Sequence, residues 1–395
     1  MYLTREEEAM LDGENGEVAQ RSLRLLVRLG EIYGAERMIP VGSVQVAGVS
    51  YKSIGDPGLD FLEDIAAKGA KVKVLTYLNP AGMDMENWKE IGFPEDFARN
   101  QIRIMEAFRK MGIVVTATCT PYLAGNLPRF RESIAWSESS AVSFSNSVIG
   151  ARTNREGGPS ALAAAICGVT PNYGLHLDEN RKPDVVIEVD ADLKFNVDYG
   201  ALGYHVGKLV KNKNPYFKGL KNPNTDQLKA LGAAMAASGA VALYHAEGCT
   251  PEARDFDVSG LERFHVGKEE LKATFDKLNT GQEPDIIILG CPHASLREIS
   301  ALADMVAGKS LKKPVWICTS RVMKEAADRM GFTETIEKAG GRVVADTCMV
   351  VSPIEDMGYS CTGVNSGKAA NYLPGFCNQK VVFHSVEELV KGALK

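Results

Sequence analysis

The 395-residue sequence contains no long hydrophobic run, no block of basic residues and no apolar N-terminal segment. Its longest weakly polar stretch, Leu231–Tyr244, includes Ser238 and is too short and too rich in Gly and Ala for a membrane span. Residues Met1–Glu8 have no apolar core, so we expect no signal peptide and a cytoplasmic protein. The net charge of −5 at pH 7, without a basic cluster, argues against a nucleic-acid-binding groove.

The motifs of several common site types are also missing. No CxxC pair occurs among the eight cysteines, which argues against a zinc ribbon or a thioredoxin-type site. The H-E-x-x-H motif of zinc proteases and a G-x-G-x-x-G after a first strand are absent as well. Residues Asn365–Asn371 include Gly367 and Lys368 but lack the full phosphate-loop spacing, which excludes nucleotide hydrolysis. An anion clamp at Gly367 and Lys368 stays open, with a solvated surface lysine as the alternative.

Strand-like and helix-like segments alternate in both halves of the chain, which predicts an α/β fold with mainly parallel sheets. The chain is longer than one hydrophobic core usually serves. We therefore expect three regions, namely residues 1–130, a Ser/Gly/Arg-rich middle region 131–275, and residues 276–395. The expected strands are 39–50, which includes a turn, 72–78, 113–118, 285–289, 314–318, 342–347 and 380–383. The expected helices are 17–30, 58–67, 94–110, 161–166, 296–307 and 321–339.

Cys119, Cys291 and Cys348 each follow one of these apolar, strand-like runs. The carboxyl ends of the strands in an open parallel sheet line the ligand crevice, so three thiols delivered there can converge on one soft metal centre. Three thiolates are one fewer than the four that usually hold an iron–sulfur cluster. The missing ligand would leave one iron open for substrate.

The other cysteines and one histidine carry weaker signals. Cys167, Cys249 and Cys318 are best interpreted as small buried hydrophobic residues, and Cys361 and Cys377 stay undecided. His293, two residues after Cys291, either hydrogen-bonds a substrate or has a structural role.

Five segments taken together resemble the aconitase X family, in matching order over nearly the whole chain. They are Thr118–Tyr122, Trp136–Ala141, Gly150–Pro159, Gly290–His293 and Thr347–Val351. The resemblance implies aconitase-like three-layer α/β/α subdomains. It also implies an iron–sulfur cluster, of the 4Fe–4S type with one open iron, on Cys119, Cys291 and Cys348. Ordinary aconitase differs, because two of its ligands form a CxxC pair.

Full-length relatives of this kind fuse a small swivelling domain to the large one, and we expect that domain to be a separate small subunit here. By resemblance it also carries the general-base serine, so we expect no catalytic residue in this chain. Within the family the resemblance is to the archaeal branch that dehydrates (R)-5-phosphomevalonate to trans-anhydromevalonate 5-phosphate in the mevalonate pathway of isoprenoid biosynthesis. The alternatives are dehydration of cis-3-hydroxy-L-proline and a non-catalytic iron–sulfur subunit.

A substrate with a carboxylate and a phosphate needs polar clamps, and loops at strand ends are the candidates. Lys368 beside Gly367 is the first choice, because an ammonium and backbone N–H groups both favour an anion. Arg152 and Arg155, in a loop before a helix-like segment, are second choices. The remaining candidates are Gly48, Val49, Ser50, Asn79, Pro80, Ser139 and Ser140.

Overall fold

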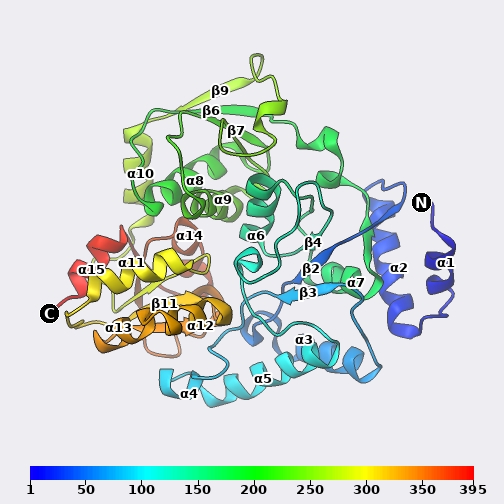
Figure 1. Ribbon diagram of the computed structural model, residues 1–395, viewed down its shortest axis with the longest axis horizontal. Coiled ribbons are helices and arrows are strands. Elements are labelled where there is room, and N and C mark those ends of the chain that lie inside the picture. Colours follow the sequence, from blue (N-terminus) through cyan, green and yellow to red (C-terminus); the bar gives the residue numbers. More distant parts are fainter.

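The computed structural model describes residues 1–395 as three units, each built around a sheet and its helices (Figure 1). The first unit has a parallel sheet of strand order β3-β2-β4 and an antiparallel pair, β1-β5. Its elements are α1 (Arg5–Leu11), α2 (Glu17–Ile32), β1 (Met38–Pro40), β2 (Ser43–Val46), α3 (Tyr51–Ala67), β3 (Leu75–Leu78), α4 (Trp88–Ile91), α5 (Glu95–Lys110), β4 (Ala135–Trp136), α6 (Ser139–Phe144), α7 (Gly158–Cys167) and β5 (Val169–Pro171).

The second unit, green in Figure 1, has a parallel sheet of order β8-β7-β6-β9. Its helices α8 and α9 pack closely against each other. Its elements are β6 (Val185–Val189), α8 (Asn196–Val210), β7 (Pro215–Lys218), α9 (Thr225–Gly239), β8 (His245–Ala246), β9 (Glu262–Val266) and α10 (Lys268–Leu278).

The third unit contains a five-stranded parallel sheet of order β12-β11-β10-β13-β14. Its elements are β10 (Ile286–Leu289), α11 (Leu296–Val306), β11 (Val315–Thr319), α12 (Arg321–Arg329), α13 (Phe332–Lys338), β12 (Arg342–Ala345), β13 (Cys361–Val364), α14 (Gly367–Phe376), β14 (Lys380–Phe383) and α15 (Val386–Ala393). No helix of the chain combines the length and the apolar content needed to cross a membrane.

The middle strand of the third sheet, β10, is buried on both faces, as a parallel strand covered by helices on each side should be. Ile286 and Ile288 belong to the largest core cluster, whereas Ile287 and Leu289 belong to a separate cluster under α11 and α15. The predicted α/β fold with mainly parallel sheets is therefore confirmed.

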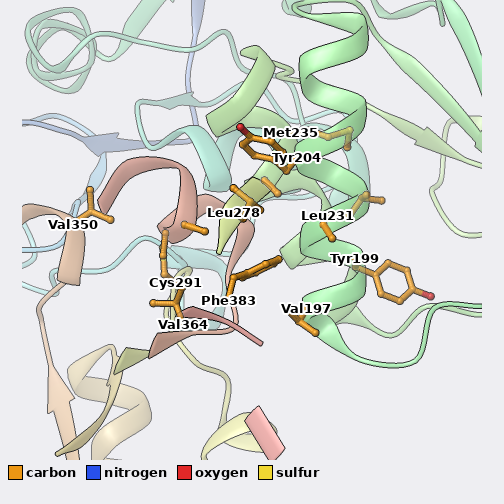
Figure 2. Close-up of a cluster of buried hydrophobic side chains, with 14 of the residues drawn as sticks. Val197, Tyr199, Tyr204, Leu231, Met235, Leu278, Cys291, Val350, Val364 and Phe383 are labelled. Carbon is orange, nitrogen blue, oxygen red and sulfur yellow. The ribbon is translucent and has the colours of Figure 1, made fainter. Parts of the chain in front are cut away.

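The largest core cluster joins the second and third units (Figure 2). Tyr204 of α8 and Leu231 of α9 belong to the same cluster as Val364 and Phe383 from the third sheet, and Cys291 is part of it. Burial of this shared apolar surface fixes the loop after β10 against the second unit.

Several expected boundaries differ from the observed ones. Residues 113–118 form no strand. They run beside β3 with one isolated bridge between Leu78 and Ala117. The expected helix 321–339 is divided between α12 and α13 at Gly331, whose positive φ of 76° ends the helical run. The boundary expected near residue 130 falls within the first unit, because β4 pairs with β2.

Candidate metal centre and substrate cavity

One cavity of about 250 Å³ brings together residues that lie far apart in the sequence. Cys119 comes from the first unit, whereas Cys348 and Lys368 come from the third. The complete lining is Asn79, Pro80, Cys119, Ser137, Glu138, Ser139, Cys348, Val350, Val351, Lys368, Tyr372 and Phe376. Six of the predicted site residues therefore share this cavity, namely Asn79, Pro80, Cys119, Ser139, Cys348 and Lys368.

Cys119 is held by the first sheet although no strand precedes it. Thr118 N donates a hydrogen bond to Leu78 O at 2.9 Å, and Gln45 Nε2 donates to Thr118 O at 2.7 Å. These bonds tie the residue before Cys119 to β2 and β3. The Cys119 sulfur is buried and accepts a hydrogen bond from His293 N at 3.1 Å.

Cys291 and Cys348 follow two strands of the third sheet, β10 and β12. Gly290 has a positive φ of 85°, and a Cβ there would lie 2.1 Å from Cys318 O, so only glycine fits the turn before Cys291. Cys348 N donates to Ala81 O at 3.4 Å, which ties the Cys348 loop to the first unit. The Cys291 and Cys348 side chains lie close together, and Cys119 and Cys348 line the cavity, whereas Cys291 lies outside its lining.

The three thiols differ in acidity because their partners differ. Burial raises the pKa of Cys119 to about 12, and the Lys368 charge opposes this rise. The hydrogen bond with Cys348, followed by burial, raises the pKa of Cys291. The same hydrogen bond lowers the pKa of Cys348 against the effect of burial, with a further contribution from Lys368. The Lys368 charge thus favours the thiolate form of all three cysteines, which is the form that binds metals.

A buried ion pair lines the same cavity. Lys368, in the first turn of α14, contacts Glu138 Oε1 and lies 3.2 Å from Ser140 Oγ. Burial opposes ionisation of both partners, yet the Lys368 charge lowers the pKa of Glu138. Glu138 and the three thiols likewise outweigh burial and raise the pKa of Lys368. Lys368 is only 6% exposed, so the alternative of a solvated surface lysine is wrong.

Glu138 is a residue that the sequence analysis did not select. It is the N-cap of α6, where its carboxylate accepts a hydrogen bond from Ser140 N at 3.3 Å. The sequence signal was limited to a carboxylate at a helix start, because its partner Lys368 lies 230 residues away. Asn79, in the cavity wall, has a buried Oδ1 without a hydrogen-bond partner, so this atom is a free acceptor for a ligand.

The other predicted clamps lie outside the cavity lining. Ser50 Oγ donates to the backbone oxygen of Val351, a lining residue, at 2.7 Å, and Val49 O accepts from Gln101 Nε2 at 2.9 Å. Gly48 precedes them at a positive φ of 80°. Of these three residues, Ser50 supports the cavity wall from behind through Val351, whereas the bond of Val49 goes to Gln101 of α5.

Gly367, Arg152 and Arg155 also lie outside the lining. A Cβ on Gly367 would lie 2.4 Å from Gly200 O, so this glycine allows α14 to approach α8 closely. Arg152 is buried in an ion pair with Asp178, and exposed Arg155 donates to a backbone oxygen at 3.0 Å. The structure therefore brings neither arginine into the cavity.

The donor set fits a soft metal cofactor, because three buried sulfur atoms are the ligand chemistry of iron–sulfur clusters. No group of three or more His, Cys, Asp or Glu side chains in the chain is arranged to hold a single metal ion. All eight cysteines are free, and only Cys119 and Cys348 line the cavity.

Comparisons with known proteins show the family and the fold of the chain. Three family profiles match in order: the aconitase X first domain over residues 1–179, the second domain over 183–276 and the third domain over 284–395. The crystal structure titled Thermococcus kodakaraensis aconitase X (holo-form) superposes with a TM-score of 0.94 at 52% identity, covering 100% of both chains.

Two of three curated relatives span the same length as this chain, and the third is longer. The phosphomevalonate dehydratase large subunit of Methanocaldococcus jannaschii is 59% identical over 99% of this chain and 100% of its own. That of Methanothermobacter thermautotrophicus is 54% identical over 99% of this chain and 98% of its own. The cis-3-hydroxy-L-proline dehydratase of Pseudomonas aeruginosa is 35% identical over 98% of this chain and 69% of its own length. The chain therefore belongs to the aconitase X family.

Proposed function

We propose that this chain is the large subunit of a hydro-lyase that dehydrates (R)-5-phosphomevalonate to trans-anhydromevalonate 5-phosphate. The observation that carries the proposal is that Cys119 and Cys348 line one cavity with Lys368, and that Cys291 lies beside Cys348. Relatives of 50–59% identity bear the name phosphomevalonate dehydratase large subunit, which supports this substrate. The reaction serves isoprenoid biosynthesis through the mevalonate pathway.

Cys119, Cys291 and Cys348 are the proposed ligands of an iron–sulfur cluster of the 4Fe–4S type. When bound, such a cluster would supply a Lewis-acidic iron without a protein ligand, which assists departure of the C3 hydroxyl group. The buried Lys368 ammonium lies close enough to the three thiols to favour their thiolate forms. The N-terminal end of α14 adds a partial positive charge on the same side.

The chain's own residues bind and orient the substrate in this proposal. Lys368 attracts its negative charge, while Ser139 and Ser140 lie at the start of α6 beside the Lys368–Glu138 pair. The free Oδ1 of Asn79 accepts a hydrogen bond from a substrate hydroxyl, and Pro80 shapes the adjacent wall. The apolar walls contributed by Val350 and Phe376 exclude water around the reacting carbons.

The proton at C2 must be removed by a base, and we assign this role to a serine of a small swivelling-domain subunit. The words "large subunit" in the names of the relatives support the existence of such a partner. The expected assembly is a heterodimer or a multiple of it, in the cytoplasm.

The test is anaerobic turnover by the chain combined with its small subunit. We expect water loss from (R)-5-phosphomevalonate and none from cis-3-hydroxy-L-proline. Turnover of hydroxyproline alone would replace the proposed substrate by that of the 35% identical relative. Absence of turnover with both, by a complex that contains iron and sulfide, would favour a non-catalytic iron–sulfur subunit.

A further inference from the structure

His293 lies where the three cysteine-bearing loops meet, and it has no exposed surface. Thr118 Oγ1 lies 3.0 Å from its Nδ1, and Thr347 O lies 2.7 Å from its Nε2. A carbonyl oxygen only accepts, so Nε2 carries the hydrogen and Nδ1 of the neutral ring accepts from the Thr118 hydroxyl. Thr118 directly precedes Cys119, and Thr347 directly precedes Cys348.

The backbone N–H and carbonyl groups of His293 are hydrogen-bonded, as both ring nitrogens are. Its N–H donates to the Cys119 sulfur at 3.1 Å, and its carbonyl oxygen accepts from Lys229 Nζ at 3.1 Å. Lys229, on α9, is buried and ion-paired with Glu298 at 2.5 Å and with Asp226 at 3.1 Å. The second unit therefore holds the residue that links the first and third units.

We propose that His293 is the positioning residue that sets the spacing of Cys119, Cys291 and Cys348 before any cluster binds. It follows Cys291 by two residues, and its ring reaches the residues before the other two cysteines on opposite edges. A rigid planar ring with one acceptor and one donor can bridge two loops at a fixed separation. The proposal rests on the proposed cluster site and gives this histidine a role away from the substrate.

The first test measures thiol reactivity in the cluster-free full chain, so it does not depend on turnover. His293→Phe removes both ring hydrogen bonds, and we expect iodoacetamide to alkylate Cys119 and Cys348 about ten- to a hundredfold faster. Cys167, in the core of the first unit, is the internal reference and should keep its rate. Peptide mass spectrometry resolves the three sites. Unchanged rates at Cys119 and Cys348 would overturn the proposal.

His176→Phe is the matched control. His176 is also buried, but neither of its ring nitrogens has a hydrogen-bond partner. Its replacement should leave the alkylation rates unchanged. An equal acceleration at Cys119 in this control would show that loss of any buried imidazole loosens the chain, and it would overturn a specific role for His293.

If His293→Phe fails to fold, Cys167 will also be alkylated rapidly. Two further variants then keep the test decisive. Thr118→Val removes only the hydroxyl that the ring accepts from, and should accelerate alkylation at Cys119 more than at Cys348. His293→Gln retains one amide donor and one acceptor, and should restore part of the protection. Wild-type reactivity at Cys119 in Thr118→Val would contradict the proposal.

Anaerobic reconstitution provides a readout of the cluster itself. His293→Phe should lose iron and sulfide faster than wild type on dilution, with an altered electron paramagnetic resonance spectrum, while His176→Phe should match wild type. Equal retention and identical spectra would overturn the positioning role. If the wild-type chain takes up no iron, the proposed function fails, and the alkylation series still decides whether His293 positions the thiols.

Discussion

Replacing Lys368 by methionine tests whether Lys368 and Glu138 form a buried ion pair in the cavity wall. The substitution leaves the Glu138 carboxylate buried without its partner. Removing one partner of a buried ion pair costs about 3–5 kcal/mol of unfolding free energy. The double variant Lys368→Met, Glu138→Gln removes both charges, so we expect it to recover more than half of that loss. The assay is urea unfolding of the reduced, cluster-free chain for the wild type, both single variants and the double variant.

The control is Lys338→Met, which breaks an exposed pair with Glu334 whose side chains are 72% and 69% exposed. Such pairs contribute less than about 1 kcal/mol, so its unfolding curve should nearly overlay that of wild type. Additive effects of the Lys368 and Glu138 substitutions, with a coupling energy below about 0.5 kcal/mol, would refute the buried pair.

The remaining predictions concern the thiols, a buried histidine, the substrate clamp and the partner. Cys119→Ser, Cys291→Ser and Cys348→Ser should each lose bound iron and activity, whereas Cys167→Ser should retain both, as iron analysis and turnover will show. Full iron content in one of the three would remove that residue from the ligand set. Burial lowers the pKa of His176 to about 4 from an ordinary value near 6.5. Unfolding therefore takes up a proton between these values, and stability should fall by about 2 kcal/mol from pH 8 to pH 5 on this account. Urea unfolding of His176→Phe should lack this component, and an unchanged pH dependence would contradict it. Lys368→Ala should lower kcat/KM for phosphomevalonate, normalised to bound iron, about ten- to a hundredfold, and unchanged normalised kinetics would exclude Lys368 as the clamp. The chain alone should be inactive, and substantial dehydration without a partner would contradict the two-subunit assignment.

The fold of the third unit was predictable because its signals are local. Ile286–Leu289 is a short apolar run between turn residues, and α11 has an apolar stripe at helical spacing that begins at the cap Ser295. The failure at residues 113–118 has a physical reason. An apolar extended segment becomes a strand only if a neighbour pairs along its length, and here the one bridge joins Ala117 to Leu78.

The candidate site was predictable only at residues whose own type and local sequence position indicate a metal ligand or a substrate contact. Asn79 and Cys348 were found because each follows a strand, and Lys368 because it lies at a helix start. Cys119 was found because it follows an apolar extended run, and all four line the cavity. The partner of Lys368 was missed, because ion pairing between segments 230 residues apart is set by the packing of units and leaves no local pattern.

The contacts of His293 were likewise not predictable from local sequence patterns. A histidine next to a cysteine suggested contact with substrate as one reading, whereas its ring nitrogens contact Thr118 and Thr347 in two other loops. Neither partner is near His293 in the sequence, so its role became visible only in three dimensions.

The most direct test of the central claim is Mössbauer spectroscopy of the complex with its small subunit, reconstituted with iron-57. We expect a cluster in which one iron subsite changes its spectrum when (R)-5-phosphomevalonate is added, while the subsites held by Cys119, Cys291 and Cys348 do not. A complex that binds no cluster, or a cluster whose spectrum is identical with and without this substrate, would contradict this expectation.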